Sequence, residues 1–198
     1  MTEASAPAQP AAPLQDAPGR RPVARSTTVF EGAIFDVVRE DVDFTAQVRF
    51  TREYLRHSGA VAVLALDEDE NVLMIRQYRH PAGAELWEIP AGLLDVAGED
   101  PVAAAARELA EETGHAASAY EPLVTLRPSP GCSDETIEVF LATGLHALAE
   151  DDYERTDEEA GILLRRVPLA EAATAALSGR ITNATAVAAI LAARARRA

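Results

Sequence analysis

The sequence contains no lysine, and all 18 of its basic residues are arginines. Chemistry that needs a lysine amine is therefore excluded, including a Schiff base and the lysine of a phosphate-binding loop. Arginine remains available to bind phosphate groups in a bidentate manner. Genome base composition is an alternative explanation of the deficit.

Cysteine and long apolar runs are also scarce. The single Cys132 cannot form a disulfide within the chain, which favours a reducing compartment. No run of about 18 apolar residues occurs, so no transmembrane helix is expected. The first residues lack the basic start and apolar core of a secretory signal. We therefore expect a cytoplasmic protein without a membrane partner.

Positive charge is in deficit as well, since the net charge is −14 and the pI is near 4.7. A protein that binds nucleic acid needs a basic surface, so we expect no nucleic-acid partner. A nucleotide substrate is compatible with this charge, because metal ions can mediate contact with its phosphates.

The chain divides into three parts. Residues 1–22 are rich in proline, alanine and glutamine without any period, which predicts a disordered tail. Residues 23–58 predict a small sheet of their own, with a hairpin that turns near Gly32 and a further strand through Phe50. Residues 59–198 predict one larger domain.

The larger domain combines strands with helical segments. The continuous apolar run at residues 60–66 predicts a buried strand, and residues 72–75 predict its antiparallel partner across an acidic turn. A helix is expected to begin at Pro101 and to pack one apolar sector on the sheet, formed by Val102, Ala105, Ala106 and Leu109. Further strands are predicted at residues 123–126, 137–142 and 162–167, and closing helices at residues 169–177 and 183–193. This order predicts an α/β fold, an α/β/α sandwich with a mixed sheet beside the small antiparallel amino-terminal sheet.

Three glutamates of the predicted helix lie on one face, in a sector different from the apolar one. Glu108 is followed at spacings of three and four residues by Glu111 and Glu112. Like charges at these spacings repel by roughly 0.2–0.5 kcal/mol per pair. Divalent cations between the carboxylates would turn this repulsion into attraction, and oxygen ligands suit Mg²⁺ or Mn²⁺. The alternative is that the three glutamates form only a solvated acidic face of the helix, paired with Arg107 and without a metal ion.

The surrounding residues resemble the Nudix box, the signature of enzymes that hydrolyse a nucleoside diphosphate linked to another group. The matching positions are Gly92, Glu99, Arg107, Glu108, Glu111, Glu112 and Gly114. Six residues separate Gly92 from Glu99, one more than in the family pattern, and the extra residue falls in the loop before the helix. His115 stands where the family has an aliphatic residue. The resemblance implies the Nudix type of α/β/α sandwich.

The resemblance also implies roles for the residues of the box. Glu108, Glu111 and Glu112 would bind Mg²⁺ or Mn²⁺ ions that grip a diphosphate, and the backbone carbonyl of Ala91 would be a further ligand. Arg107 would pair with a box glutamate and orient it. Such ions neutralise phosphate charge and lower the pKa of a bound water molecule.

An acidic loop precedes the last predicted strand. Nudix enzymes that act on ADP-ribose often take a catalytic glutamate from this part of the chain, where it positions or activates the attacking water. Glu158 and Glu159 are the candidates here, and the sequence does not choose between them. A solvated acidic loop is the alternative.

Two further stretches resemble the ADP-sugar pyrophosphatase branch of the family, residues 77–79 (Gln-Tyr-Arg) and 87–92 (Trp-Glu-Ile-Pro-Ala-Gly). A Ser-Pro-Gly turn at residues 129–131 is similar to one in that branch. The substrate-binding candidates that follow from these stretches are Arg76, Arg79, Glu88 and Glu135. Surface salt bridges are the alternative role for the arginines.

The resemblance therefore implies hydrolysis of the diphosphate of ADP-ribose to AMP and ribose 5-phosphate. One alternative is another nucleoside diphosphate sugar or a dinucleoside polyphosphate as substrate. Another is a Nudix module that binds ADP-ribose without hydrolysing it, which the intact helix glutamates disfavour. In this branch the segment matching residues 23–58 forms an interwoven dimer, so a homodimer is implied. Phe30 and Phe35 would then either stack on adenine or pack within the small sheet.

Overall fold

The computed structural model describes residues 14–149 and 161–197. The strands are β1 (Val23–Phe30), β2 (Phe35–Asp43), β3 (Arg49–His57), β4 (Ala60–Ala65), β5 (Asn71–Arg79), β6 (Ala84–Glu88), β7 (Ala91–Leu93), β8 (His115–Leu126), β9 (Ile137–Ala147) and β10 (Leu163–Pro168). The helices are α1 (Pro101–Thr113), α2 (Leu169–Leu177) and α3 (Ala184–Arg196), with a short 3-10 helix η1 at His80–Ala82. No helix among these residues is long and apolar enough to cross a membrane.

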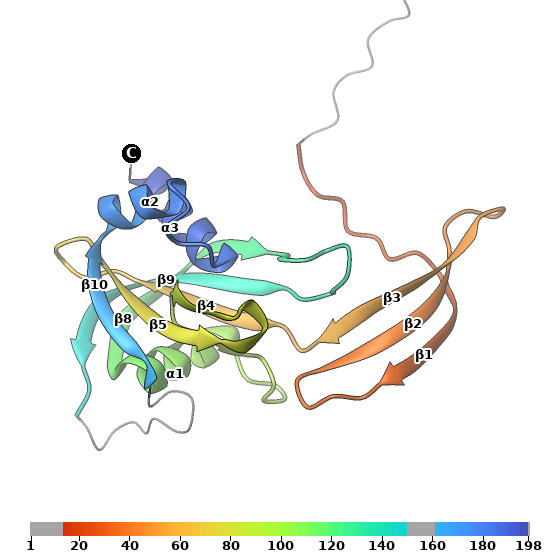
Figure 1. Ribbon diagram of the computed structural model, residues 1–198, viewed down its shortest axis with the longest axis horizontal. Coiled ribbons are helices and arrows are strands. Elements are labelled where there is room, and N and C mark those ends of the chain that lie inside the picture. The colour runs from red at the N-terminus through yellow and green to blue at the C-terminus, as the bar shows by residue number, and fades with distance from the viewer. Residues whose placement is uncertain (1–13, 150–160, 198) are drawn as a thin grey trace, which may run out of the picture.

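Strands β1, β2 and β3 form an antiparallel sheet of their own, which projects from the rest of the chain (Figure 1). The turn between β1 and β2 lies at residues 31–34, where the hairpin was expected. Every residue of β1 is exposed, so the outer strand of this sheet has no cover from the chain itself.

The body of the protein contains two sheets, and one strand pairing differs from the prediction. Strand β4 lies between β7 and β9, antiparallel to the first and parallel to the second, in a mixed sheet ordered β7-β4-β9-β8. Strand β5 lies in an antiparallel sheet ordered β10-β5-β6. The expected pairing of residues 60–66 with residues 72–75 is therefore wrong, apart from one bridge between Leu66 and Val72. Both edges of β4 are already occupied by β7 and β9, which leaves none for β5.

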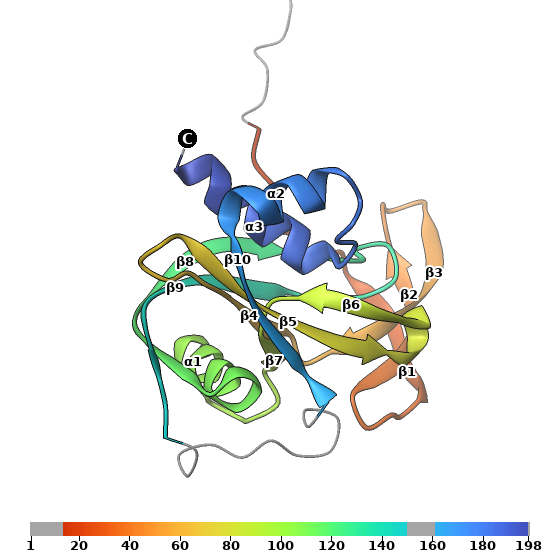
Figure 2. The same cartoon turned by 60° about the vertical axis from the view of Figure 1, so that its left-hand side comes forward.

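Helices cover both outer faces of these sheets, with α1 on one side and α2 and α3 on the other (Figure 2). Alternate residues of β4 reach opposite cores: Ala62 and Leu64 pack in the cluster that contains residues of α2 and α3, and Val61 and Val63 pack in the cluster that contains residues of α1. All of β4 is buried, as a continuous apolar run predicts for a strand covered on both faces. The α/β/α sandwich is confirmed.

The ends of helix α1 follow from local sequence. The carboxylate of Asp100 accepts hydrogen bonds from the backbone N–H groups of Val102 (2.9 Å) and Ala103 (3.3 Å), and Pro101 occupies the first turn. The helix ends at Gly114, whose φ of 67° is the left-handed conformation that glycine adopts without strain.

The buried face of α1 differs from the expected one. Ala105 and Leu109 are buried as expected, but Val102 is 38% exposed, and the helix also buries Ala104, Glu108 and Glu112. Ala104, Glu108 and Glu112 follow one another at spacings of four residues, so they form one row along the helix. Two of the three box glutamates therefore face the sheet.

A polar cluster fixes the end of α1 to the rest of the fold. His115 Nδ1 lies 2.8 Å from the carbonyl oxygen of Thr113, and His115 Nε2 accepts a hydrogen bond from Arg166 (3.1 Å), since arginine can only donate. Arg166 of β10 also pairs with Asp67 at 2.8 Å. An aliphatic residue at position 115 could make neither contact, which gives this departure from the family pattern a structural reason.

We predict that Asp67→Ala lowers the free energy of unfolding by about 1–3 kcal/mol near pH 7, because its carboxylate accepts bonds from Asn71, Asp69 and Arg166. Burial would raise the pKa of Asp67, but these hydrogen bonds outweigh it and hold the pKa below its usual value. A lowered pKa stabilises the fold above that range, and the contribution disappears as the pH falls through it. Urea unfolding at about pH 7 and about pH 3 should therefore show a smaller effect of the substitution in acid. The neighbouring Asp69→Ala is the control, and an effect of Asp67→Ala that is equal at both pH values would contradict the prediction.

Candidate functional site

Two buried glutamates of α1 lie against strand β7. Glu108 and Glu112 are only 8% and 6% exposed. The carboxylate of Glu112 accepts a hydrogen bond from the backbone N–H of Ala91, at 2.9 Å. Ala91 itself is paired with Ala62 of β4, so the sheet fixes the backbone that Glu112 contacts.

The carboxylate of Glu108 lies directly over Gly92. A Cβ atom at position 92 would lie 1.9 Å from Glu108 Cδ, far inside any allowed contact. Glycine is therefore required here for close approach, since it is the only residue without a Cβ atom. This contact gives the first glycine of the Nudix-like pattern a physical reason.

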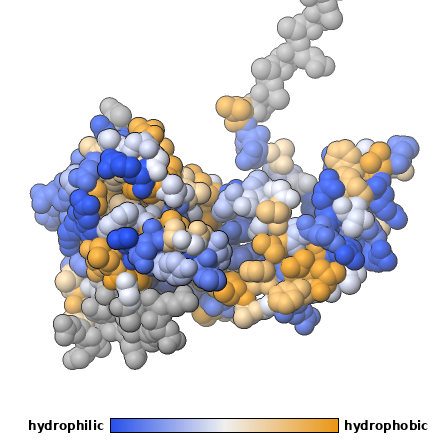
Figure 3. Space-filling model, in the orientation of Figure 1, coloured by the Kyte–Doolittle hydropathy of each residue, from blue (hydrophilic) through white to orange (hydrophobic). Residues whose placement is uncertain are grey.

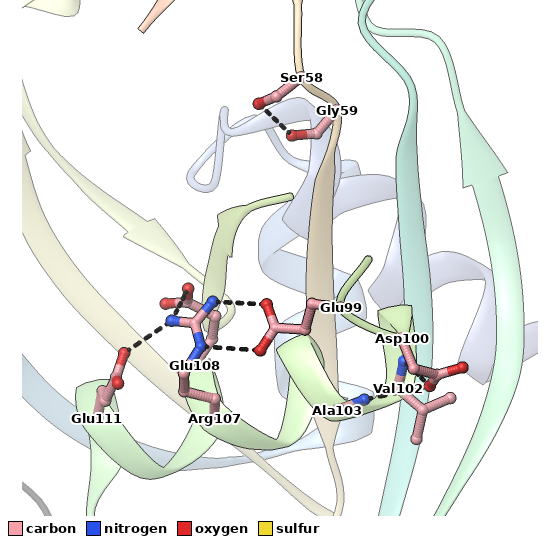
Figure 4. A network of polar contacts seen from close by, with 9 residues as sticks. All are labelled: Ser58, Gly59, Glu99, Asp100, Val102, Ala103, Arg107, Glu108 and Glu111. Atoms are coloured by element: carbon pink, nitrogen blue, oxygen red, sulfur yellow. Dashed lines mark hydrogen bonds and ion pairs between the residues drawn. The ribbon is translucent and has the colours of Figure 1, made fainter. Parts of the chain in front are cut away.

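Arg107 gathers three carboxylates of the pattern (Figure 4). Its Nε and Nη2 atoms donate to the two oxygens of Glu99, both at 3.2 Å. Its Nη1 atom donates to Glu108 at 2.7 Å and to Glu111 at 3.0 Å. Hydrogen bonding to Glu99 raises the pKa of Arg107, burial opposes this rise, and the charges of Glu108 and Glu111 add to it. This pairing forms despite the extra residue before Glu99, in a loop where Gly98 adopts a positive φ of 80°.

A cleft of about 530 Å³ opens beside Ala91 and Gly92. It brings together five residues of the sequence prediction, Arg79, Glu88, Ala91, Gly92 and Glu135. The cleft is thus bounded by the backbone of β7 on one side and by a charged pair from β5 and β6 on another.

That charged pair is Arg79 and Glu88. Arg79 Nη2 lies 2.8 Å from Glu88 Oε2, and Arg79 Nε lies 3.1 Å from Oε1, so the contact is bidentate. Glu88 is only 3% exposed and also accepts a hydrogen bond from Gln77 at 3.5 Å. The guanidinium is therefore held in one orientation at the wall of the cleft.

The structure does not bring Arg76 to this cleft. Side chains alternate between the two faces of a strand, so Arg76 points to the face of β5 opposite from Arg79. There it approaches Glu85 at 3.6 Å, and both side chains are exposed. The substrate-binding role expected for Arg76 is not supported, and the alternative of a surface salt bridge fits the contact.

Several residues of the cleft carried no signal in the sequence. The wall includes Ile34 from the turn of the amino-terminal sheet, Pro128, and residues 183–185 at the start of α3. A second cleft of about 510 Å³ shares Ile34 and Arg79 with the first and extends to Gly161. These residues meet only because distant parts of the chain converge, which no local pattern shows.

The loop that carries Glu135 is fixed to strand β3. The backbone N–H of Leu55 donates to the carbonyl of Cys132 at 2.8 Å, and Asp134 accepts the N–H of His57 at 2.9 Å. Glu135, a substrate-binding candidate from the sequence, lines the first cleft. Glu158 and Glu159 lie outside the described residues.

The carboxylate groups near Gly92 are of the kind that binds a divalent cation, but their positions in this structure do not form a complete ion site. Carboxylate oxygens are the ligands that Mg²⁺ and Mn²⁺ prefer. In the described part of the chain, no three acidic, histidine or cysteine side chains stand at the spacing that an ion requires. The carboxylates of Glu99, Glu108 and Glu111 instead converge on the guanidinium of Arg107, which already serves as a shared cation.

Comparisons with known proteins agree with this geometry. The family model of the NUDIX domain matches residues 56–189. An ADP-ribose pyrophosphatase of Mycobacterium tuberculosis is 48% identical over 167 residues, which cover 84% of this chain and 80% of that protein. An ADP-ribose pyrophosphatase of Bacillus subtilis is 38% identical over 144 residues, or 73% and 76% of the two chains. The crystal structure of an ADP compounds hydrolase has a TM-score of 0.73 at 25% identity and covers 91% of this chain and 95% of that one.

We predict that Gly92→Ala displaces the carboxylate of Glu108 and weakens binding of Mn²⁺ by more than about tenfold, with only about 1–3 kcal/mol lost from the free energy of unfolding. The methyl group would overlap the flexible end of Glu108 and not a rigid backbone, so the site should change more than the fold. Titration of Mn²⁺ by electron paramagnetic resonance and urea unfolding measure the two effects. Gly131→Ala is the matched control, because an added Cβ there meets no atom within 4 Å. Unchanged Mn²⁺ affinity in Gly92→Ala would show that Glu108 does not contribute to the ion site.

Proposed function

Since the chain belongs to the NUDIX family and is a hydrolase of that family, we propose that it hydrolyses the diphosphate of ADP-ribose to AMP and ribose 5-phosphate. The observation that carries the proposal is that Ala91 and Gly92, which the buried Glu112 and Glu108 contact, line a cleft that is also lined by Arg79. The two relatives named as ADP-ribose pyrophosphatases support this substrate.

Hydrolases of this family work with a divalent cation, for which we propose Mg²⁺ or Mn²⁺. Glu108, Glu111 and Glu112 are the proposed ligands, together with the backbone carbonyl of Ala91. When bound, the cation neutralises charge on the diphosphate and lowers the pKa of water. Glu112 contributes further by holding the N–H of Ala91, which keeps β7 at a fixed distance from the helix.

Arg79 is proposed to bind the diphosphate or the adjoining ribose. A guanidinium binds phosphate oxygens in a bidentate manner, and orientation by Glu88 reduces the freedom lost on binding. Glu88 would then act through Arg79, while Glu135, which also lines the cleft, would contact the substrate or its cation. A substrate held between these groups has its reacting phosphorus close to the box, which favours in-line attack.

Glu158 or Glu159 is proposed to position and deprotonate the attacking water, as a general base requires. Gly161, two residues beyond Glu159, lines the second cleft and supports this role. The proton leaves the water as its oxygen bonds to phosphorus, and the bridging oxygen of the diphosphate departs with the other phosphate group.

Two other functions remain distinct from this proposal. Another nucleoside diphosphate sugar or a dinucleoside polyphosphate would use the same carboxylates, because the proposed role of the box concerns the diphosphate and not the group attached to it. A module that binds ADP-ribose without turnover would need no ordered metal face, so the buried pair Glu108 and Glu112 counts against it.

We predict that a panel of nucleoside diphosphate sugars with Mg²⁺ gives fastest release of AMP from ADP-ribose. Glu112→Gln should reduce turnover by more than about tenfold, the least expected when a metal site is disturbed. Of Glu158→Gln and Glu159→Gln, the one that removes the general base should lose about 10²- to 10⁴-fold in kcat. Chromatography of the products measures each rate.

The exposed Glu171→Gln on α2 is the control for removal of a glutamate. Faster turnover of another sugar nucleotide would replace the substrate but keep the chemistry. Tight binding of ADP-ribose without product from any member of the panel would contradict the proposed hydrolysis and favour the binding module.

We further propose that the protein is a homodimer that associates through residues 23–58. This segment exposes a group of large apolar side chains, visible as orange areas over the small sheet (Figure 3). The group comprises Val23, Val29, Phe30, Ile34, Phe35, Phe44 and Val48. Apolar area of this kind marks an interaction surface. Charge is compatible with a second copy as the occupant: residues 23–58 hold five arginines and six acidic residues and are nearly neutral, whereas the rest of the chain holds 13 arginines and 26 acidic residues, so two copies of this segment repel each other little.

We predict that the wild-type chain has twice its 21.1 kDa mass in light scattering after size exclusion, and that Phe30→Asp with Phe35→Asp makes it monomeric. Both side chains are exposed within one chain, so the fold should survive, whereas burial of two charges at an interface is costly. Leu177→Asp is the control, because Leu177 is exposed at the end of α2, far along the chain from this segment. A wild-type mass of one chain at micromolar concentration would refute the dimer.

A further inference from the structure

The loop between β8 and β9 lies beside the junction of the amino-terminal sheet and the body of the protein. Residues 58–59 form that junction, since they connect β3 to β4. On the side of the sheet, the carboxylate of Asp134 accepts the N–H of His57 at 2.9 Å. On the side of the body, the carbonyl of Thr136 accepts the N–H of Ala60 at 3.0 Å. The loop therefore spans the junction and holds its two sides together.

Glu135 lies between these two anchors. It lines the first cleft together with Ile34, which comes from the turn of the amino-terminal sheet. We infer that Asp134 is a positioning residue for the proposed hydrolysis, which acts by holding Glu135 in place between the amino-terminal sheet and the body. The inference rests on the role proposed above for Glu135.

Three hydrogen bonds connect the loop to β3 among the described residues. The N–H of Leu55 donates to the carbonyl of Cys132 at 2.8 Å, and the N–H of Asp134 donates to the carbonyl of Leu55 at 3.1 Å. These two bonds involve backbone atoms alone, so they do not depend on the side chain at position 134. The third bond, to the N–H of His57, needs a side-chain oxygen. The identity of residue 134 therefore decides whether the anchor beside Glu135 is complete.

Contact with the substrate does not explain Asp134. Its side chain is exposed and lines neither of the two clefts beside Arg79. Its partner is a neutral N–H group, so the bond needs an acceptor oxygen and not a negative charge. An amide oxygen in the same place would serve equally well, which separates an action through this bond from an electrostatic action on a cation.

We predict that Asp134→Ala lowers kcat/KM for ADP-ribose by about fivefold or more, because a displacement of about 1 Å at a reacting centre can cost up to about 10²-fold. Asp134→Asn retains the acceptor oxygen, so its kcat/KM should stay within about twofold of wild type. Hydrogen exchange at the amide of His57 reports the bond without reference to activity, and it should become faster in Asp134→Ala and not in Asp134→Asn.

A double-mutant cycle with Glu135 tests the route of the effect. If Asp134 acts through Glu135, its replacement by alanine should cost less than about twofold in kcat/KM once Glu135→Gln is present. A general loosening of the fold would give the same loss in both backgrounds. Asp69→Ala is the control, because Asp69 is an exposed aspartate in the turn between β4 and β5 and should affect neither kcat/KM nor the exchange of His57. Circular dichroism checks that each variant is folded.

The outcomes separate this inference from the proposal beneath it. Wild-type kcat/KM in Asp134→Ala would overturn the inference, as would equal losses with and without Glu135 or an equal loss in Asp134→Asn. Unchanged kcat/KM in Glu135→Gln would remove the role of Glu135, and the inference with it, while hydrolysis itself would stand. No turnover of any nucleoside diphosphate sugar by the wild type would overturn the proposed function as a whole.

Discussion

The close approach of helix α1 to strand β7 is the constraint on which the rest of this structure depends. Glu108 lies over Gly92, and Glu112 reaches the backbone of Ala91, so two carboxylates are buried where apolar side chains would normally pack. Burial of a charge is tolerated only when partners replace water, and here Arg107 and a backbone N–H supply them. This contact depends on three other features. The caps fix the ends of α1, the pairing of β7 with β4 fixes the facing backbone, and Gly92 leaves room for the carboxylate of Glu108.

Local features of the fold were predicted from sequence, and pairings between distant segments were not. Asp100, Pro101 and Gly114 define the ends of α1 through groups only a few residues away, so their pattern suffices. The partner of β5 depends instead on which strands pair with the two edges of β4. The residues of β5 themselves do not indicate that β7 and β9 take those edges. The burial of Glu108 and Glu112 escaped prediction for a related reason: periodicity treats a glutamate as a surface residue, whatever its partners.

The same division applies to the candidate site. Gly92, Arg79, Glu88 and Glu135 carry recognisable residue types, and all four line one cleft, whereas the box glutamates lie behind Gly92 and Ala91 and do not line it. Arg76 shares the residue type of Arg79 but lies on the opposite face of the strand, which the alternation of side chains alone could have indicated. Ile34 and the start of α3 have no chemical signature, since they contribute shape and not reactive groups. Residue type thus pointed to side chains that line the cleft, but only tertiary contact decides which of them reach it.

The parallel pairing of β4 with β9 has a consequence for how the protein folds. Residues 60–65 cannot complete their sheet until residues 137–142 have been synthesised and have crossed over beside them. Contacts between such remote segments form slowly, because a long loop must close before they yield any stabilisation. The backbone of β7 acquires its fixed place only with that sheet, so a nascent or partly unfolded chain has the carboxylates of α1 but no surface to hold them against. The arrangement of these carboxylates against β7 therefore depends on the completed sheet and not on helix α1 alone.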